Sequence, residues 1–304
     1  MQSNQPLAPP QLPDWLRAEL PFRRRLERIG DYRIHLIDEG SGPAVLLQHG
    51  NPTWCFLWRK VVPILVEGGV RVIAPDLVGL GLSDKPRDPA VHSLDLHGRL
   101  ISELVSALGI AELTIVGQDW GGPIAGSVAS LQPGVVTGAV FANTSMRAPA
   151  RPPRITPFHR FSHLPVLSTF VFRVLNFPIP VLQFVQGDRS SIGRTERRAY
   201  RYPLRSFRDR VAPLALARMV PTSLDHPSVK SLRKVDSWAR SFAGPVRLVW
   251  GTSDPVLGRA LGGMRKLFPG AEVTETSAGH FPQEEVPVEL AEAILDVVRR
   301  SRAG

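Results

Sequence analysis

The sequence predicts an α/β protein built around a mainly parallel sheet, and three observations support this prediction. Short apolar runs of strand character alternate with stretches of helical periodicity along most of the 304 residues. Several of these runs are apolar throughout, as expected for strands that helices cover on both faces. The alternation stops between about 146 and 242 and then resumes, which indicates an insertion into one core.

Seven segments carry the strand pattern. The first two, 33–40 and 44–50, are predicted to pair with each other as early strands. Because parallel strands end at a common edge of the sheet, where such proteins bind ligands, the residues that follow the strands are the candidates for function. The other five predicted strands are 71–77, 113–119, 135–143, 246–252 and 271–277.

Two helices show their ends as well as their periodicity. In the segment 94–110, apolar residues recur at three- and four-residue spacing on one face, and Gly109 stands where a helix would end. The last predicted helix begins at Pro287, carries acids early and finishes with Arg299 and Arg300. That order of charges suits the helix dipole.

The interrupting segment predicts a second structural unit. It is rich in proline, arginine and phenylalanine, so we expect a helical cap over 146–242 and a core formed by 1–145 and 243–304. The cap should lie over the carboxyl edge of the sheet. Its most apolar part, 163–185, is long enough to raise the question of a membrane span, but Arg173 and three prolines interrupt it. A pair of short buried or pocket-lining helices is therefore predicted, and surface contact with a membrane or a second subunit is the lesser alternative.

Composition excludes several classes of protein. A hydrophobic content of 43% with 21% charged residues is ordinary for a soluble globular protein. The only cysteine, Cys55, excludes an internal disulfide and a cysteine-cluster metal site, and it fits a reducing compartment. The first 20 residues lack a basic region followed by an apolar run, so no signal peptide is predicted and a cytoplasmic location is expected.

The formal net charge of +10 raises the question of an anionic partner. The densest basic run, 194–210, holds seven arginines and two acids. A nucleic-acid surface is one interpretation, but no recognition motif accompanies the run. We therefore interpret it as a solvated face and expect no nucleic-acid partner.

Four motifs fall at the ends of predicted strands. They are HGNPT at 49–53, GQDWG at 117–121, the turn around Asp254 and the loop around His280. The second places Asp119 where many hydrolases carry the serine of a nucleophile elbow. Nucleophile, acid and histidine then follow in the order of a catalytic triad. Singly, each residue also fits a structural role, as a helix cap, a turn residue or a loop histidine.

These motifs resemble those of the haloalkane dehalogenase family of the α/β-hydrolase fold, and the resemblance covers nearly the whole chain. The shared stretches include HGNPTWCFLWR, GLGLSDKP, VGQDWGG and GHFPQEE. The GxDWGG pattern also occurs in epoxide hydrolases, but these usually carry an aromatic residue where Asn51 stands. The resemblance implies a mainly parallel sheet with helices on both faces and a helical cap insertion. Its implied substrate is a small apolar halogenated molecule, with water as the second reactant and a halide ion as a product, and no metal or organic cofactor.

The resemblance also assigns roles to five residues. Asp119 would be the nucleophile, His280 the base that activates water, and Asp254 the acid that orients the imidazole. Asn51 and Trp120 would donate side-chain N–H groups to the halogen and backbone N–H groups to an oxyanion. The residue types agree with these roles, because indole is a pure donor, an amide offers two N–H donors, and a carboxylate attacks without a base.

The identity of the acid separates branches of the family. Some relatives carry a glutamate after the preceding core strand, where this sequence has Asn143. Another branch uses a second tryptophan from the cap, but the only tryptophan near the cap is Trp238, at its very end. The chain therefore resembles the branch with Asn51, Trp120 and Asp254. Relatives in that branch tend to associate, so the resemblance also points to a homo-oligomer.

Three other functions stay open on the sequence. An epoxide hydrolase would need two cap tyrosines as acids, and the only tyrosines after Tyr32 are Tyr200 and Tyr202, two residues apart. A non-catalytic receptor of the same fold would not need an intact triad. A fluoroacetate dehalogenase would need basic side chains in its pocket.

The phenylalanines expected to set the size of the pocket are Phe158, Phe161, Phe170 and Phe172.

Overall fold

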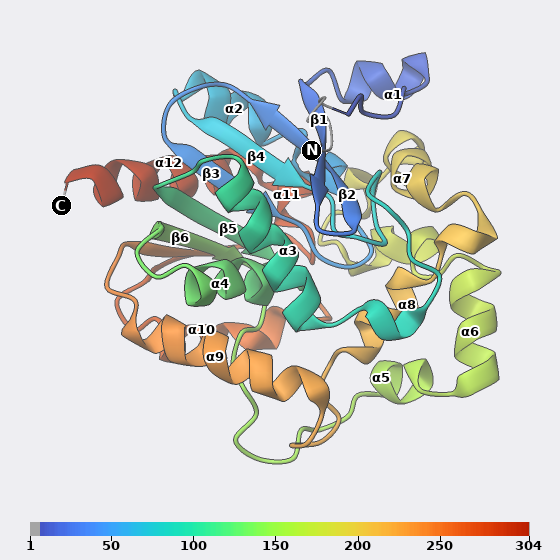
Figure 1. Ribbon diagram of the computed structural model, residues 1–304. Coiled ribbons are helices and arrows are strands. Elements are labelled where there is room, and N and C mark those ends of the chain that lie inside the picture. Colours follow the sequence, from blue (N-terminus) through green and yellow to red (C-terminus); the bar gives the residue numbers. More distant parts are fainter. Residues whose placement is uncertain (1–6, 304) are drawn as a thin grey trace.

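An eight-stranded sheet runs through the centre of the computed structural model, which describes residues 7–303 (Figure 1). Its strand order is β1-β2-β4-β3-β5-β6-β7-β8. The six strands from β4 to β8 are parallel, whereas β2 is antiparallel to both of its neighbours. The strands are β1 (Arg24–Ile29), β2 (Tyr32–Glu39), β3 (Ala44–Gln48), β4 (Arg71–Pro75), β5 (Leu113–Gln118), β6 (Val136–Ala142), β7 (Val246–Gly251) and β8 (Glu272–Thr276).

The mainly parallel sheet is confirmed, but the predicted pairing of its first two segments is wrong. Strand β2 pairs with β1 and β4, whereas β3 lies between β4 and β5. The error arose because β1 was missed. Its sequence, RRLERI, has four charged residues, and only Leu26 and Ile29 are buried. Charged side chains on the open face of this edge strand concealed the apolar pattern.

Helices cover both faces of the sheet, as predicted (Figure 1). On one face lie α3 (Leu94–Ala107), α4 (Gly121–Leu131) and α9 (Pro227–Ser241), and on the other lie α2 (Val62–Glu67) and α12 (Pro287–Ala303). Helix α3 begins where the Ser93 side chain accepts the Leu96 N–H, and Gly109 follows its end with a φ of 65°. Three shorter helices complete the core: α1 (Asp14–Glu19), α10 (Leu261–Leu267) and α11 (Pro282–Glu285).

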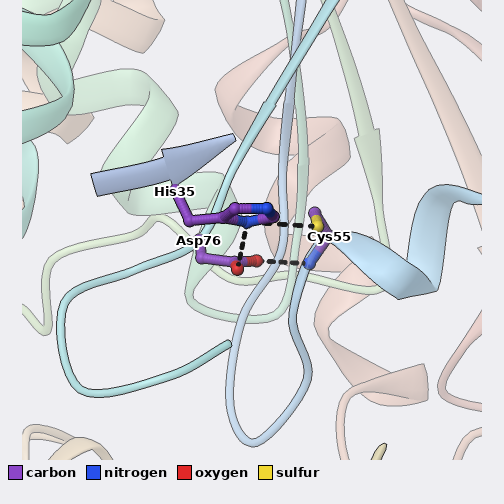
Figure 2. A group of neighbouring side chains, drawn as sticks. All are labelled: His35, Cys55 and Asp76. Atoms are coloured by element: carbon purple, nitrogen blue, oxygen red, sulfur yellow. Dashed lines mark hydrogen bonds and ion pairs between the residues drawn. The ribbon is translucent and has the colours of Figure 1, made fainter. Parts of the chain in front are cut away.

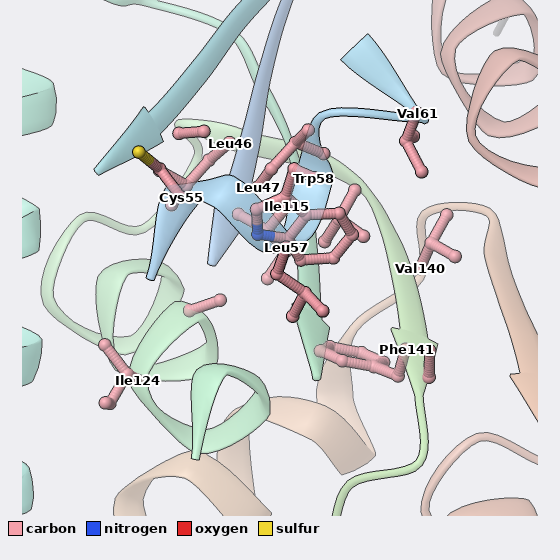
Figure 3. Packing of buried hydrophobic residues seen from close by; sticks show 14 of the residues in the cluster. Leu46, Leu47, Cys55, Leu57, Trp58, Val61, Ile115, Ile124, Val140 and Phe141 are labelled. Carbon is pink, nitrogen blue, oxygen red and sulfur yellow. The ribbon is translucent and has the colours of Figure 1, made fainter. Parts of the chain in front are cut away.

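The core is packed most tightly around the central strands. In Figure 3, the 3₁₀ turn η1 (Cys55–Trp58) lies against side chains of β3 and β5, and Phe141 of β6 lies nearby. Leu57, Trp58 and Phe141 are completely buried. Each large apolar side chain buried in this way stabilises the fold by about 1.5–3 kcal/mol. The carboxyl ends of β3 and β5 are therefore held side by side on a rigid base.

The segment between β6 and β7 contains helices only. Residues 143–245, all of which the structure describes, form no strand. Its last helix, α9, packs against α4 of the core. The part that reaches over the carboxyl edge of the sheet is formed by α5 (Pro157–Ser162), α6 (Pro165–Arg173), α7 (Arg194–Arg201) and α8 (Ala212–Arg218), together with 3₁₀ turns that include η3 (Ile179–Val185). The boundaries of a separate cap at 146–242 stay a proposal, and residues 1–6 of the expected core lie outside the described range.

The apolar stretch 163–185 differs from its prediction. Phe172 of α6 and Leu182 of η3 are buried, but Val166 and Phe170 are exposed. The sequence pattern had predicted buried or pocket-lining helices, and it could not show that one face of α6 has no partner. Within residues 7–303, no helix is long and apolar enough to cross a membrane.

Candidate active site

Asp119 occupies a sharp turn between β5 and α4. Its φ of 52° lies in the left-handed region, which is costly for any residue other than glycine. The turn fits because glycines flank it: a Cβ on Gly121 would lie 2.0 Å from the Gln48 carbonyl oxygen. The Thr144 hydroxyl donates to the Asp119 carbonyl at 2.6 Å and fixes the turn from outside. This geometry is that of a nucleophile elbow.

Two backbone N–H groups face the Asp119 carboxylate. The Asn51 N–H, just beyond β3, donates to Oδ1 of Asp119 at 2.8 Å. The N–H of Trp120, the N-cap residue of α4, also bonds the carboxylate. Because β3 and β5 are neighbours in the sheet, their ends bring together two donors that are 69 positions apart in the chain. Such a pair of fixed donors can stabilise negative charge on an oxygen between them.

His280 lies between two carboxylates. Its Nδ1 is 2.9 Å from Oδ2 of Asp254, and its Nε2 is 3.8 Å from Oδ2 of Asp119. The same Asp254 oxygen accepts from the amide of Asn143 at 2.8 Å, and the other accepts the Val256 N–H at 2.7 Å. Asp254 is therefore fixed on both oxygens, and it holds the imidazole with Nε2 toward Asp119.

Asp119, Asp254 and His280 shift one another's pKa values. Burial raises the pKa of the Asp119 carboxyl, and His280 and the two N–H donors only partly offset this. Burial also acts to raise the pKa of Asp254, but His280 and the hydrogen bonds lower it overall. For His280, burial acts to lower the pKa, but Asp254 outweighs burial and raises it. Asp254 thus stays ionised and stabilises a proton on the imidazole.

The carboxylate of Asp119 opens into a cavity of about 400 Å³ beneath the cap. Asn51, Trp120 and His280 line it from the core side. The Asn51 amide donates one N–H to the Pro213 carbonyl at 3.0 Å, so its second N–H is free of that bond. Apolar side chains complete the wall, including Phe158, Phe177, Val181, Leu182, Val185, Ala217 and Val220.

A second chamber of about 280 Å³ reaches the same carboxylate. Both chambers are lined by Asp119, Trp120, His159 and Val220. The smaller one ends at Arg147, which is exposed at its rim. The structure thus brings four of the five predicted site residues to one pocket and places the fifth, Asp254, behind His280. It also adds a branch that the sequence did not predict.

Comparisons with known proteins agree with this geometry. A family model described as the α/β hydrolase fold matches residues 43–287. A haloalkane dehalogenase of Mycobacterium marinum is 34% identical over 272 residues, which cover 86% of this chain and 88% of the relative. Haloalkane dehalogenase 2 of Mycobacterium tuberculosis is 33% identical over 284 residues, covering 91% and 95% of the two chains. The chain belongs to the haloalkane dehalogenase family.

Solved structures show the same architecture. The tetrameric haloalkane dehalogenase DpaA of Paraglaciecola agarilytica superposes with a TM-score of 0.77 at 25% identity, over 95% of this chain and 97% of the other. The dehalogenase DbeA of Bradyrhizobium elkani gives a TM-score of 0.81 at 22% identity, over 93% and 99% of the two chains. At that identity the second comparison supports the fold alone.

Sequence reasoning missed two residues that support the site of this dehalogenase family member. Gln118 is buried, and its amide donates to the His280 carbonyl at 2.8 Å, so it ties the histidine loop to the elbow. Asn143 was noted only because it replaces a glutamate, whereas the structure shows that it donates to Asp254. The signal for both was a polar amide side chain at the carboxyl end of a mainly apolar strand.

The cap phenylalanines divide into different roles. Phe158 lines the larger chamber, and Phe172 is completely buried behind it, with ring centroids 6.3 Å apart. Phe161 stacks on Phe172 at 6.5 Å. The expectation for Phe170 was wrong, because its side chain is 51% exposed on the outer face of α6.

A buried cluster of His35, Cys55 and Asp76 lies outside both chambers (Figure 2). One Asp76 oxygen accepts the Cys55 N–H at 2.7 Å, and the other lies 2.8 Å from His35 Nδ1 and accepts the Leu82 N–H at 2.7 Å. Burial raises the pKa of the Cys55 thiol well above its usual range, so the thiolate that a metal needs is disfavoured. Hydrogen bonding alone therefore explains the cluster, which ties the loop after β4 to η1.

Proposed function

We propose that this family member hydrolyses haloalkanes to an alcohol and a halide through a covalent ester on Asp119. The observation that carries the proposal is the placement of a carboxylate, rather than a hydroxyl, at the elbow of an apolar pocket. A carboxylate displaces a leaving group from carbon without help from a base. Two side-chain N–H donors beside it suit a departing halide.

In the first step, an Asp119 carboxylate oxygen attacks the carbon that bears the halogen. The carbon–halogen bond breaks, and its electron pair leaves with the halide toward Asn51 and Trp120. The apolar walls exclude water, so each N–H donor acts with more force on the developing charge than it would in solution. The product of this step is an alkyl ester of Asp119.

In the second step, water attacks the carbonyl carbon of that ester. His280 Nε2 accepts the proton of the water, and Asp254 stabilises the resulting imidazolium. The backbone N–H groups of Asn51 and Trp120 stabilise the oxyanion. Collapse of the tetrahedral intermediate releases the alcohol, which takes the proton, and restores the Asp119 carboxylate after loss of one proton to solvent.

An epoxide hydrolase would need an acid to protonate an alkoxide, and neither cap tyrosine fills that role. The Tyr200 hydroxyl is buried and donates to Glu284 at 2.6 Å. Tyr202 packs edge-on against Trp15 at 6.0 Å. Neither lines a chamber that reaches Asp119. A fluoroacetate dehalogenase is also disfavoured. Among the described residues no lysine or arginine lines the larger chamber, and Arg147 of the smaller one is exposed at its rim.

The direct test of the proposed function is a halide-release screen. Purified protein is mixed with chlorinated, brominated and iodinated alkanes, with styrene oxide alongside. We expect halide and alcohol in equal amounts from the haloalkanes and no diol from the epoxide. Epoxide opening without any halide release would show that the protein is an epoxide hydrolase instead. No turnover of haloalkanes or of the epoxide would favour a non-catalytic receptor.

The halide donors give a prediction that depends on the leaving group. Asn51→Leu and Trp120→Phe should each reduce dehalogenation about a hundredfold or more, because each removes one preorganised N–H from developing charge. Chloroalkanes should suffer more than iodoalkanes, since chloride leaves less readily and concentrates more charge. The measurement is halide release from matched chloro-, bromo- and iodoalkanes.

Trp54→Phe provides the matched control for the tryptophan. It also removes an indole N–H, but that group donates to the Ala199 carbonyl at 3.2 Å rather than toward the pocket. We expect this variant to lose stability while keeping the wild-type order of halides. Normal halide release by both pocket variants would contradict the assignment of Asn51 and Trp120.

Asp254 gives a prediction with a pH signature. Asp254→Asn should stall hydrolysis of the ester, because the imidazole loses the carboxylate that stabilises its cation. Asp254 raises the pKa of His280, so its removal lowers that pKa. Neutral His280 is the active form and is lost as the pH falls through its pKa. The acid limb of the residual activity should therefore move to lower pH.

The exposed Asp225→Asn serves as its control, because it makes the same change of charge away from the site. Its pH profile should match that of the wild type. Near-normal activity of Asp254→Asn would mean that another carboxylate orients His280.

We further infer a cytoplasmic, self-associating protein. Cys55 is a buried free thiol, which suits a reducing compartment. The relative from Paraglaciecola agarilytica is described as tetrameric, and this supports association without identifying the surface. Sedimentation velocity across a range of concentrations tests the oligomer, and a single monomer species throughout would exclude it.

A further inference from the structure

Nearly all of the net charge lies in one stretch of the chain. Residues 151–210 hold 12 arginines and three acidic residues, a net charge of +9, whereas the whole chain carries +10. One of the three acids, Glu196, faces the guanidinium of Arg59 at 3.5 Å. Six of the 12 arginines lie on α5, α6 and α7, and the other six lie in the turns and loops around these helices.

The same stretch exposes most of the large apolar side chains found on the described surface. Ten of the 13 large hydrophobic residues that are exposed lie within 151–210. On and just after α6, the exposed fractions are 83% for Val166, 53% for Leu167, 51% for Phe170 and 46% for Val174. Their three- and four-residue spacing places them on one side of the helix. A contiguous apolar face of this kind on a soluble protein marks a contact surface.

Arginines gather around the C-terminal end of α6, where the buried Arg210 donates to the carbonyls of Arg173 and Val174 at 2.8 and 3.1 Å and to that of Arg205. The Arg173 guanidinium lies 4.2 Å from the ring centre of Phe207, which is 48% exposed. Arg205 lies 4.3 Å above the ring of Tyr202. Arginine stems cover apolar surface while their charged ends stay in water. Exposed apolar side chains with basic groups around them are typical of segments that lie in a membrane interface.

The inner face of α6 packs behind the wall of the pocket. Phe172 packs against Phe177 with ring centroids 5.2 Å apart and against Phe158 at 6.3 Å. Both of these partners line the larger chamber. One helix therefore has its inner face against side chains that line the Asp119 chamber and its outer face in solvent.

We propose that the outer face of α6, with the arginines around its C-terminal end, docks on an anionic lipid surface. Each basic group near such a surface adds to the attraction, and the apolar side chains enter the region between headgroups and acyl chains. Docking would bring the pocket close to the lipid bilayer, in which apolar haloalkanes concentrate. Only this delivery of substrate rests on the proposed function, because the lipid contact itself needs no catalysis.

Two other occupants fit the surface less well. A second copy placed symmetrically on this face would bring two stretches of net charge +9 together. A nucleic acid would satisfy the arginines but would leave Val166, Leu167 and Phe170 without an apolar partner. A lipid surface with anionic headgroups satisfies both the charge and the apolar side chains.

The test is flotation of the full chain with vesicles of phosphatidylcholine that contain phosphatidylglycerol, against vesicles of phosphatidylcholine alone. One variant carries Val166→Ser, Leu167→Ser and Phe170→Ser. A second carries Arg205→Gln and Arg208→Gln, which are exposed and flank Phe207 in the chain. The matched control carries Leu131→Ser and Val288→Ser, which are 48% and 50% exposed outside the stretch. A short, water-soluble bromoalkane measures activity away from lipid.

We expect the wild type and the control to bind only the anionic vesicles and to dissociate at high salt. Each test variant should lose about tenfold or more of this binding while keeping normal turnover of the soluble bromoalkane. The proposal is overturned if the wild type binds anionic vesicles no better than neutral ones, or if the serine variant binds as the wild type does. It is also overturned if the serine substitutions change only the oligomeric state and not vesicle binding. The same holds if the arginine substitutions weaken binding to a DNA duplex and leave binding to anionic vesicles unchanged.

Binding is measured without substrate, so the two proposals fail separately. Vesicle binding by a protein that releases no halide would contradict the proposed function alone. Halide release by a protein that ignores vesicles would contradict the docking alone.

Discussion

Asp119→Ala releases no halide from any haloalkane above the uncatalysed rate, if Asp119 is the nucleophile. Within the described part of the chain, the only other carboxylate beside His280 is that of Asp254, which is held by Asn143, Val256 and His280 itself. Loss of a nucleophile removes the whole covalent route, so we expect a decrease on the order of 10⁴-fold or more in turnover. The measurement is halide release under conditions in which the wild type turns over many times.

The fold should survive this substitution. Alanine keeps the backbone of the elbow, and the Thr144 bond to the residue 119 carbonyl does not involve the side chain. A thermal melt of the variant provides the control, and we expect a cooperative transition. Substantial halide release by a folded Asp119→Ala protein would remove Asp119 from the mechanism.

His280→Phe is expected to release halide once and then stop. Asp119 needs no base for the displacement, so the ester still forms, but no group is left to activate water. One equivalent of halide per active site should appear, followed by no further turnover. Intact-protein mass spectrometry should show the mass of the alkyl group, and digestion should place it on the peptide that contains Asp119.

His226→Phe is the matched control, because this histidine caps α9 and lies outside both chambers. It should turn over continuously and carry no adduct. A His280→Phe protein that stays unmodified after long exposure to an accepted bromoalkane would contradict the two-step scheme. An adduct on another residue would mean that this residue, and not Asp119, is the nucleophile.

The sequence was sufficient to predict the positions of most strands, because these positions depend on local patterns of apolar residues. Most of the strands contain runs of buried apolar residues, and seven of the eight were located within a few residues of their ends. Strand β1 escaped because its edge position leaves charged residues on one face. Pairing of β2 was misjudged for the same reason, since the missing strand and β4 are its true neighbours.

The pocket residues that follow strands were also predictable. Asn51, Asp119 and His280 each lie beyond a strand end, and parallel strands bring such residues to one edge. The cap was less predictable, because its short helices are oriented by long-range contacts. Nothing in the local sequence distinguished Phe172, which is buried, from Phe170, which is half exposed.

The ester on Asp119 is the central claim, and a single turnover in heavy-oxygen water tests it most directly. Wild-type enzyme in excess over a bromoalkane is allowed one turnover, after which the alcohol and the peptide that contains Asp119 are analysed by mass spectrometry. Water attacks the ester carbonyl, so the first alcohol should keep the original carboxylate oxygen and one heavy oxygen should remain on Asp119. Heavy oxygen in the first alcohol, with an unlabelled Asp119, would mean that water attacks the haloalkane directly and that no ester forms.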